Sequence, residues 1–179
     1  MSAYMKFATP MIDQECLLAA LADIGFHRGQ VEVHDAPVRL SGFEGLFRPQ
    51  KAEIIIRRQY VSAASNDIGF RFTPTGYTAI VSDYDKRRFG PNWLTQLHEK
   101  YQVHEQRKIA RLMEEARRAA EEEARIKAEL EMQRLEEERR RLVESQRQTV
   151  HEKARKLGYQ VQEKREGDVL RLVLVKRVF

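Results

Sequence analysis

Two acidic residues and a lone cysteine are the first candidates for chemistry. Asp83 and Asp85 flank Tyr84 at the end of a predicted strand, like the short acidic pair that holds a metal–nucleotide in some transferases. Cys16 falls in the first turn of a predicted helix, where the helix dipole can lower the pKa of a thiol. Acids at a strand end more often cap a turn, and no His neighbours Cys16 in sequence. We therefore favour a turn cap and a small buried side chain.

The histidines provide no further candidate site, and the common catalytic motifs are absent from the sequence. His98 and His104 lie six residues apart, which does not place them on one face of a helix, so a metal there would need ligands from elsewhere. The sequence contains no P-loop and no GxGxxG, GxSxG or HExxH motif. We expect a protein that is not an enzyme, with no catalytic residue, metal or cofactor. An enzyme using Cys16 or the Asp83/Asp85 pair is a remote alternative.

Basic residues with aromatic neighbours form a candidate binding face. Arg57, Arg71 and Arg171 fall on predicted strands, on the face opposite Phe70 and Phe72. A basic segment, Lys86–Arg88, follows the second of these strands and is itself followed by Trp93. A sheet face of this kind can stack single-stranded bases, but acids are interleaved and IGFRF lacks the pattern of RNA-recognition strands. A solvated face or a protein contact is favoured over nucleic acid. The candidate face comprises Arg57, Arg71, Arg171, Lys86, Arg87, Arg88 and Trp93.

Composition limits the class of protein that must position these residues. The chain has 179 residues and a formal net charge of +5, which allows one domain with or without an appendage. A single Cys excludes a disulfide framework and suits a reducing compartment. The N-terminus lacks the apolar stretch of a signal peptide, and no run is long enough for a membrane span. We expect a cytoplasmic protein that does not bind membranes.

Charge divides the chain into unequal parts. The 54 residues from His104 to Leu157 hold 15 Lys+Arg and 13 Glu, with no Asp, Gly or Pro, which predicts a long charged helix. Pro91 is placed for its first turn and Gly158 for its end. Several Glu–Arg and Glu–Lys pairs four residues apart support it, among them Glu136–Arg140 and Glu137–Arg141. Because this segment nets only +2 (15 − 13), it is not a basic tail for nucleic acid.

The N-terminal segment has the strand and turn signals of a small sheet. Asp13 is a good N-cap for a helix that ends at Gly25. The consecutive isoleucines in Ala52–Arg58 predict a strand covered on both faces, and Ile68–Phe72 alternates with Phe72 inward and Gly69 outward. The other expected elements are a strand over Tyr4–Ala8, weak strands over Gln30–His34 and Val38–Leu40, a loop marked by Gly42, Gly45 and Pro49, and a hairpin strand over Tyr77–Ser82.

The C-terminal segment predicts a second hairpin that needs a partner. Tyr159–Lys164 and Val169–Val178 flank a turn at Glu166-Gly167-Asp168, and VLRLVLV indicates a central strand. Because a lone two-stranded hairpin is marginal in water, we expect it to complete a sheet. The fold class is α+β: a small antiparallel sheet packed on two helices and interrupted by the long helix. The expected parts are 1–104 (N-terminal α+β part), 105–148 (long helix) and 149–179 (helix end and hairpin).

The length of the helix poses a geometric problem. Unbroken, it would be about 100 Å long, whereas the remaining residues would fold into a domain about 30–35 Å across. The favoured solution is an antiparallel coiled-coil dimer with its dyad near Lys127, in which each hairpin completes the other chain's sheet. A helical hairpin turning at Glu121–Glu123 or Ser145, and a solitary helical spacer, are the alternatives. Apolar spacing of three and four residues begins at Ile109, drifts out of phase between Ile126 and Leu142, and resumes from Val143 to Leu157.

A family resemblance rests on short blocks of sequence: VRLSGFEG, AEIIIRR, DIGFRF, GYTAIVSDYD, WLTQLHEKYQVH, GYQV and LRLVLVKR. They resemble the Ycf-thirty-five-like proteins of cyanobacteria, plastids and other bacteria, which carry domain of unknown function twelve-fifty-seven. The resemblance covers about residues 4–104 and 149–177. In compact relatives the helix with the Tyr-x-x-His segment, here Tyr101 to His104, runs almost directly into the turn that is here Gly158-Tyr159.

The resemblance implies a small α+β domain with the C-terminal hairpin in its sheet, and it supplies no catalytic residue. Relatives are associated in genomes with AAA-type ATPases, which implies an accessory role in a larger machine. Together with the long helix, this favours a non-enzymatic assembly or adaptor protein, a dimer bridged by the helix that binds another protein. The alternative is a nucleic-acid-binding accessory protein.

Overall fold

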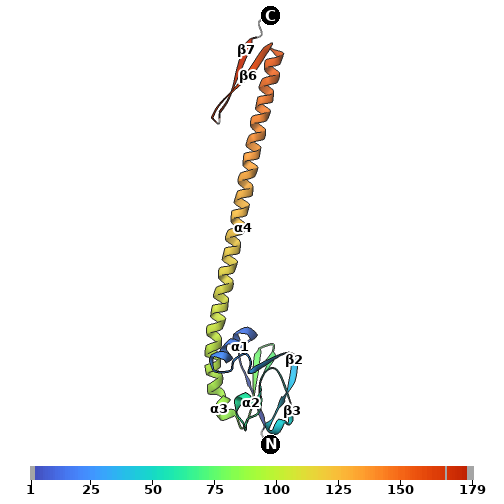
Figure 1. Ribbon diagram of the computed structural model, residues 1–179, viewed down its shortest axis with the longest axis vertical. Coiled ribbons are helices and arrows are strands. Elements are labelled where there is room, and N and C mark those ends of the chain that lie inside the picture. The colour runs from blue at the N-terminus through green and yellow to red at the C-terminus, as the bar shows by residue number, and fades with distance from the viewer. Residues whose placement is uncertain (1–2, 168, 177–179) are drawn as a thin grey trace. The chain divides into compact units, whose positions relative to one another are not determined.

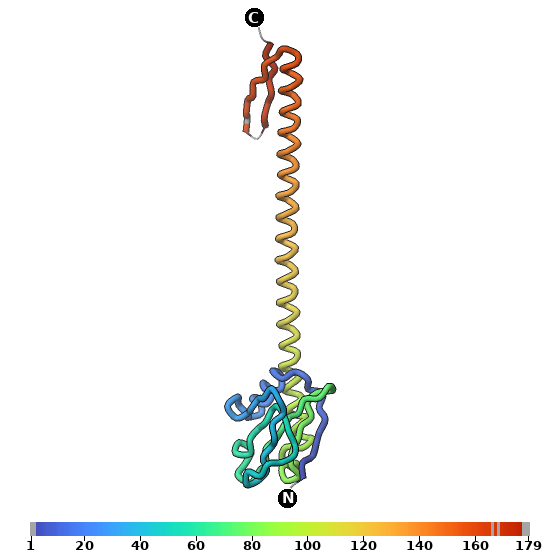
Figure 2. Tube along the Cα trace, turned by 90° about the vertical axis from the view of Figure 1, so that its right-hand side faces the viewer, coloured from blue at the N-terminus to red at the C-terminus, as the bar shows by residue number. Residues whose placement is uncertain are grey.

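The computed structural model describes residues 3–167 and 169–176 and has an α+β fold. The chain divides into two compact units between Glu114 and Glu115. The first unit, which holds the N-terminus in Figures 1 and 2, contains a five-stranded antiparallel sheet in the order β1-β5-β4-β3-β2. Its strands are β1 (Tyr4–Ala8), β2 (Val31–Ser41), β3 (Phe47–Ile56), β4 (Ile68–Thr73) and β5 (Gly76–Ser82).

Helices cover one face of this sheet. They are α1 (Gln14–Asp23), α2 (Arg58–Val61), α3 (Lys86–Phe89) and the first turns of α4 (Pro91–Lys156), with a 3₁₀ turn, η1 (Phe43–Gly45), between β2 and β3. Asp13 caps α1 as predicted, because its Oδ1 accepts a hydrogen bond of 2.9 Å from the Cys16 N–H. The core between sheet and helices includes Leu17, Leu21, Ile54, Ile56, Phe70 and Leu97.

The first turns of α4 are attached to the start of α1. The hydroxyl of Tyr101, which is buried, accepts from the backbone N–H groups of Ile12 (3.2 Å) and Asp13 (3.0 Å). Lys108 Nζ lies 2.7 Å from Asp13 Oδ2 and 2.9 Å from Glu15 Oε2. These bonds satisfy part of the open N-terminal end of α1, and they make the beginning of the long helix an integral part of the first unit.

Three details of the predicted sheet are wrong. The two weak strands are one bulged strand, β2, and Pro49 lies within β3 rather than in a loop. Phe72 is 49% exposed, and Gly69 is buried under Leu40, where an added Cβ would lie 2.7 Å from that of Ala52. The predicted coverage of β3 on both faces is confirmed, since all three isoleucines are fully buried.

Helix α4 is a single helix of 66 residues, so the internal turns considered at Glu121–Glu123 and Ser145 do not form. Intrahelical ion pairs run along it, including Arg140–Glu136 and Arg117–Glu121, each at 2.8 Å. The helix ends at Lys156, and Gly158, two residues further on, has a φ of 79°, a left-handed conformation that favours glycine.

The C-terminal hairpin consists of β6 (Tyr159–Glu166) and β7 (Val169–Lys176), which form a two-stranded sheet of their own. In the described residues of one chain the hairpin therefore does not complete the N-terminal sheet, and β7 is not a central strand. Asp168 and Val178, expected in its turn and in its second strand, lie outside the described residues. The hairpin lies beside the last turns of α4 in both views (Figures 1 and 2).

Candidate functional site

Cys16 is a buried core residue, as favoured from the sequence, and not an activated thiol. Only 2% of it is exposed, and burial raises the pKa of its thiol to about 11. Burial also acts to raise the pKa of the neighbouring Asp13, but hydrogen bonds from Lys108 and from the Cys16 backbone outweigh it and hold that pKa below its usual value. A high thiol pKa beside a carboxylate opposes nucleophilic chemistry.

The acidic pair at the end of β5 holds a turn. Asp85 is buried and accepts hydrogen bonds from the hydroxyls of Ser65 (2.6 Å) and Ser82 (2.5 Å) and from the Asn66 backbone N–H (3.1 Å). The side chain of Asp83 is exposed. Since the protein's own donors occupy the Asp85 carboxylate, the arrangement has the character of a structural turn cap.

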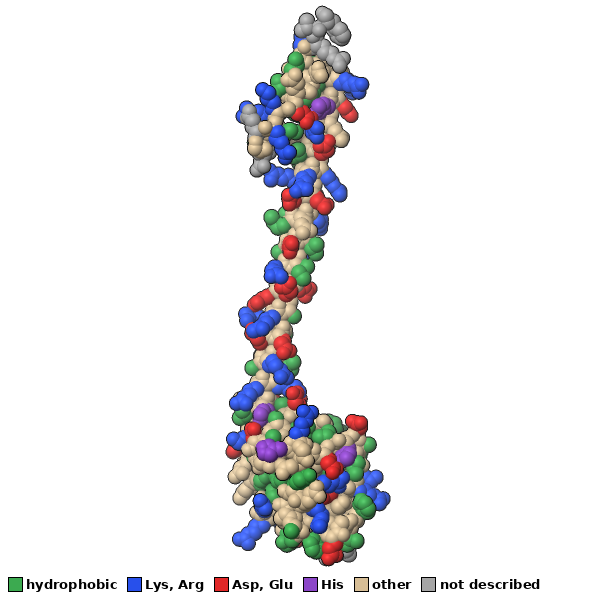
Figure 3. All heavy atoms as spheres, in the orientation of Figure 1, with side chains coloured by type: hydrophobic (Ala, Val, Ile, Leu, Met, Phe, Trp, Pro, Cys, Tyr) green, Lys and Arg blue, Asp and Glu red, His purple; other side chains and the backbone are tan. Residues whose placement is uncertain are grey.

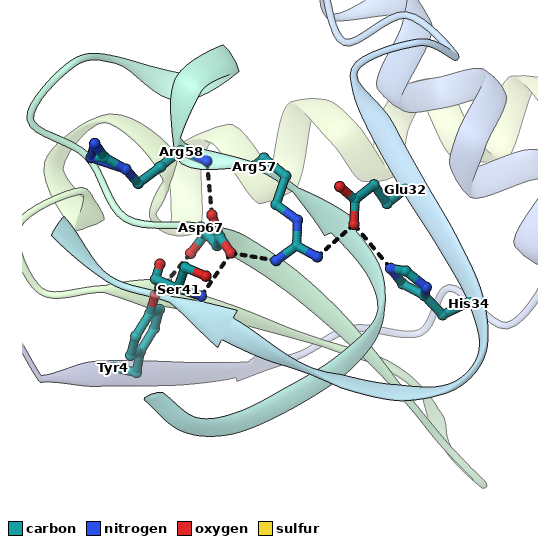
Figure 4. A network of polar contacts seen from close by, with 7 residues as sticks. All are labelled: Tyr4, Glu32, His34, Ser41, Arg57, Arg58 and Asp67. Carbon is teal, nitrogen blue, oxygen red and sulfur yellow. Dashed lines mark hydrogen bonds and ion pairs between the residues drawn. The ribbon is translucent and has the colours of Figure 1, made fainter. Parts of the chain in front are cut away.

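A second buried carboxylate, which the sequence analysis missed, is Asp67 (Figure 4). It is completely buried and accepts from the Ser41 N–H (2.7 Å), the Arg58 N–H (2.8 Å) and Arg57 Nη1 (2.9 Å). Tyr4 donates to its backbone oxygen at 3.2 Å. The segment that precedes β4 is thereby connected to β1, β2 and α2. Its only sequence signal was a run of small polar residues between two strands.

Arg57, a member of the candidate face, belongs to the same network. Its Nη2 lies 2.6 Å from Glu32 Oε2, which also accepts from His34 Nε2 at 3.0 Å (Figure 4). Hydrogen bonds with Glu32 and then Asp67 raise the pKa of Arg57, and Arg57 in turn lowers that of Glu32. Two carboxylates thus neutralise this guanidinium, so Arg57 is part of an internal polar network and not a free cation for a binding face.

Trp93 also does not belong to an exposed face. It packs against the core with its ring 5.2 Å from that of Phe89 and 6.2 Å from that of Phe26, both edge-on. A ring held in this cluster is not a platform for bases. The cations of α3 remain at the surface: Lys86, Arg87 and Arg88 are exposed, and the last two line a shallow hollow with Tyr84.

The remaining arginines are divided between two sheets. Arg71 is exposed on β4, where it lines a small hollow with Lys6 of β1 and Lys51 of β3. Arg171 lies on β7, paired with Lys164 of β6 in the other sheet. The predicted single face is therefore wrong. A group of three cations on the outer side of the first sheet takes its place.

The histidines do not come together. His104 Nε2 lies 2.9 Å from Asp23 Oδ2, whereas the ring of His98 stacks on that of Tyr101. Within residues 3–167 and 169–176, no three His, Cys, Asp or Glu side chains gather as a group that could hold a metal ion. No helix in this described part of the chain has the length and apolar character needed to cross a bilayer.

Apolar side chains are also exposed over much of the second unit. Aliphatic side chains of α4 project between its charges (Figure 3), among them Ile126 and Leu130. On the hairpin, the side chains of Val169, Val173 and Val175 share the face of β7 opposite to Leu172. These valines are exposed, and we call them the outer hairpin face. The sequence showed their apolar character but not that they stay uncovered.

Comparison of the chain with protein-family models, with curated proteins and with solved structures gives no match. The resemblance to the Ycf-thirty-five-like family therefore stays a prediction, and the function has to be argued from the surfaces themselves.

Proposed function

We propose that this protein is a non-enzymatic assembly or adaptor protein of the cytoplasm, which associates with itself through α4 and binds another protein through its hairpin. The observation that carries this proposal is the outer hairpin face. A two-stranded sheet with exposed valines on one side is marginal in water and favours a covering partner. By contrast, the first unit has a well-formed core between its sheet and helices.

The hairpin is held in a defined position for such a partner. Its other face turns toward α4 at Glu163, which accepts from Arg147 at 2.7 and 2.9 Å and lies opposite Leu172 on β7. Leu174, on this same face, is 52% exposed, so apolar surface is uncovered on both faces of the hairpin. In the register of the two strands, Val175 and Val173 lie opposite Gln160 and Gln162, and Val169 lies opposite Glu166. Arg171, between Val169 and Val173, lies opposite Lys164. Apolar side chains with polar and charged neighbours are found in protein interfaces.

Self-association would make the protein bivalent. Two copies joined through α4 present two identical hairpins, so a partner with two sites gains avidity without new contacts. Relatives implied by the family resemblance are associated with AAA-type ATPases, which are oligomers with repeated sites. We therefore propose that the partner is part of such a machine.

Co-purification with full-length variants tests the proposal. Val173→Thr/Val175→Thr keeps β-branched side chains but removes methyl groups from the outer hairpin face. We expect partners recovered with the wild-type bait from the native host to be lost with this variant. The matched control, Gln160→Thr/Gln162→Thr, changes polar residues on the same face and should retain them. Equal recovery with both variants would remove the hairpin from the proposal.

Nucleic-acid binding is the second candidate, and the observation that favours it is the group of Lys6, Lys51 and Arg71 on the outer side of the sheet. Such binding would weaken steeply with salt, because phosphate contacts release counterions. We expect an Arg71→Ala/Lys51→Ala variant to lose salt-sensitive binding of single-stranded nucleic acid. No binding by the wild type at low salt would exclude this candidate.

A further inference from the structure

An apolar seam runs along the exposed part of α4. Starting at Ile109, steps of three and four residues lead to Leu130 with one polar position, Glu123, so Ile126 and Leu130 continue the first phase rather than drift from it. This is the a/d pattern of a coiled coil. The seam positions are Ile109, Leu112, Ala116, Ala119, Glu123, Ile126 and Leu130.

The seam is uncovered and ends within the helix. Ile126 is 50% and Leu130 is 56% exposed. Continuing the same steps past Leu130 reaches Gln133, Glu137 and Arg140, which are polar. Further along, Ala154 is buried on the stretch of α4 that the hairpin accompanies. The seam is therefore a local surface of about three heptads, about 30 Å long at 1.5 Å per residue.

Charges beside the seam are segregated by heptad position. The residues at g, immediately before the a positions, are Lys108, Glu115, Glu122 and Glu129, and Glu136 follows one heptad further on. Lys108 is paired with Asp13 and Glu15 of the first unit. The e positions after the d positions hold Met113, Ala120 and Lys127, followed beyond the seam by Arg134 and Arg141. From Glu115 onward, one flank of the seam is thus acidic and the other is neutral to basic.

This segregation distinguishes the two orientations of a helix pair. In a parallel pair, each g residue faces the e residue five positions further along the other helix. Glu122 then meets Lys127, and Glu129 meets Arg134, twice each because the pair is symmetric. In an antiparallel pair, g residues face g residues and e residues face e residues. When the midpoint of the pair lies between Ala119 and Ile126, the glutamates at g of one helix therefore face those of the other. Like charges at such positions are destabilising.

We propose that α4 binds α4 of a second copy of this chain as a parallel, in-register coiled coil over Ile109–Leu130. This inference rests on the self-association proposed above. The antiparallel arrangement expected from the length of the helix is thereby replaced. Within one chain Glu122 bonds Arg125 at 2.8 Å and Arg134 lies 3.9 Å from Glu138. Both are contacts between exposed side chains, which can turn to a partner helix at little cost.

The seam also accounts for why the pair is not a long, permanent coiled coil. Two of its positions are Ala and one is Glu, and Glu123 faces its own copy in the parallel register. A polar residue at an a position sets register at a cost in stability. The dimer is consequently reversible, and its formation depends on concentration.

Position-specific disulfide formation tests the orientation. In full-length protein with Cys16→Ala, cysteines are introduced one at a time as Ala116→Cys, Leu130→Cys and, as control, Ala128→Cys on the opposite side of the helix. In a parallel pair every seam residue faces its own copy, so the first two variants both form a disulfide-linked dimer under mild oxidation. The control remains monomeric.

An antiparallel pair has one dyad, and residues 14 apart, about 21 Å along a helix, cannot both face their own copies. A dimer in sedimentation equilibrium that forms neither self-disulfide, but links Ala116→Cys with Ile126→Cys in a mixture, would overturn the parallel arrangement and leave self-association intact. A monomer at all concentrations would overturn both. The partner-binding role of the hairpin is decided separately by the valine variants.

Discussion

Arg147 of α4 and Glu163 of β6 form a two-point ion pair, with Nε 2.7 Å from Oε1 and Nη2 2.9 Å from Oε2. His151, one helical turn further on, also contacts Oε1 at 2.8 Å. The hydrogen bond with Glu163 raises the pKa of Arg147, and the bonds with Arg147 and then His151 lower that of Glu163. One carboxylate therefore fixes the register of the hairpin against the last turns of the helix.

Replacing Arg147 by Ala should loosen the hairpin without unfolding the helix. The pair is at the surface, so its effect is local, and the neighbouring helix keeps its own hydrogen bonds. We expect faster amide hydrogen exchange in β6 and β7 and unchanged exchange in the first unit. The matched control is Arg125→Ala, which removes an ion pair of 2.8 Å with Glu122 within α4 itself. Equal exchange in the two variants would contradict the assignment.

Acid should release the hairpin in the same way. Because the pKa of Glu163 is lowered in the folded state, its stabilisation is complete above the unfolded-state pKa of about 4.3. It is lost as the pH falls through the lower, folded-state value. We expect hairpin amides to lose protection below about pH 4 in the wild type. Glu163→Gln should show little of this step, since its side chain does not titrate.

Removing the buried carboxylate of Asp67 should destabilise the first unit. Asp67→Ala leaves two backbone N–H groups and one guanidinium nitrogen without their acceptor, which we expect to cost about 2–4 kcal/mol. Trp93 is the only tryptophan and packs in this unit, so its fluorescence during urea unfolding measures the loss. Asp83→Ala, at an exposed carboxylate, should change the free energy of unfolding by less than about 0.5 kcal/mol. Similar losses in both variants would show that the network is not stabilising.

The thiol of Cys16 should be inert in the folded protein. With a pKa of about 11 and almost no exposure, it is ionised in roughly one molecule in a thousand at pH 8. We expect modification by an aromatic disulfide reagent to be slower than in urea by on the order of a hundredfold. Rapid modification of the native protein would show an accessible thiolate and reopen an enzymatic role for this residue.

The elements that could be predicted from sequence are those with strong local signals. Asp13 as N-cap, Pro91 at a helix start and Gly158 at its end are local stereochemical preferences, and the structure confirms all three. The burial of Gly69 could not be predicted, because it depends on Leu40 of the bulged strand β2. Nor could the exposure of Phe72, which lies beyond the three residues of β4 that pair with β3.

The candidate face failed for a related reason. Strand alternation placed Arg57 on a sheet face. The position of its side chain is instead set by ion pairs with Asp67 and Glu32, which are 10 and 25 residues away in sequence. Trp93 was drawn into the core by Phe26 and Phe89. Pairings over such separations are set by tertiary packing, which has no local sequence signal. The outer hairpin face was missed because the apolar strand β7 was assigned to the middle of a sheet.

Charge inversion across the α4 seam should reveal its orientation without new cysteines. Glu122→Lys/Glu129→Lys places cations opposite Lys127 and Arg134 of a parallel partner, so we expect the dimer to weaken by about tenfold or more in sedimentation equilibrium at low salt. Adding Lys127→Glu/Arg134→Glu exchanges the charges on both flanks, and in a parallel pair residues 122 and 129 again face opposite charges. Affinity should return to that of the wild type. In an antiparallel pair the fourfold variant would set lysine against lysine and glutamate against glutamate, and affinity would stay low. High salt, which screens these surface charges, should bring the variants closer together in the parallel case.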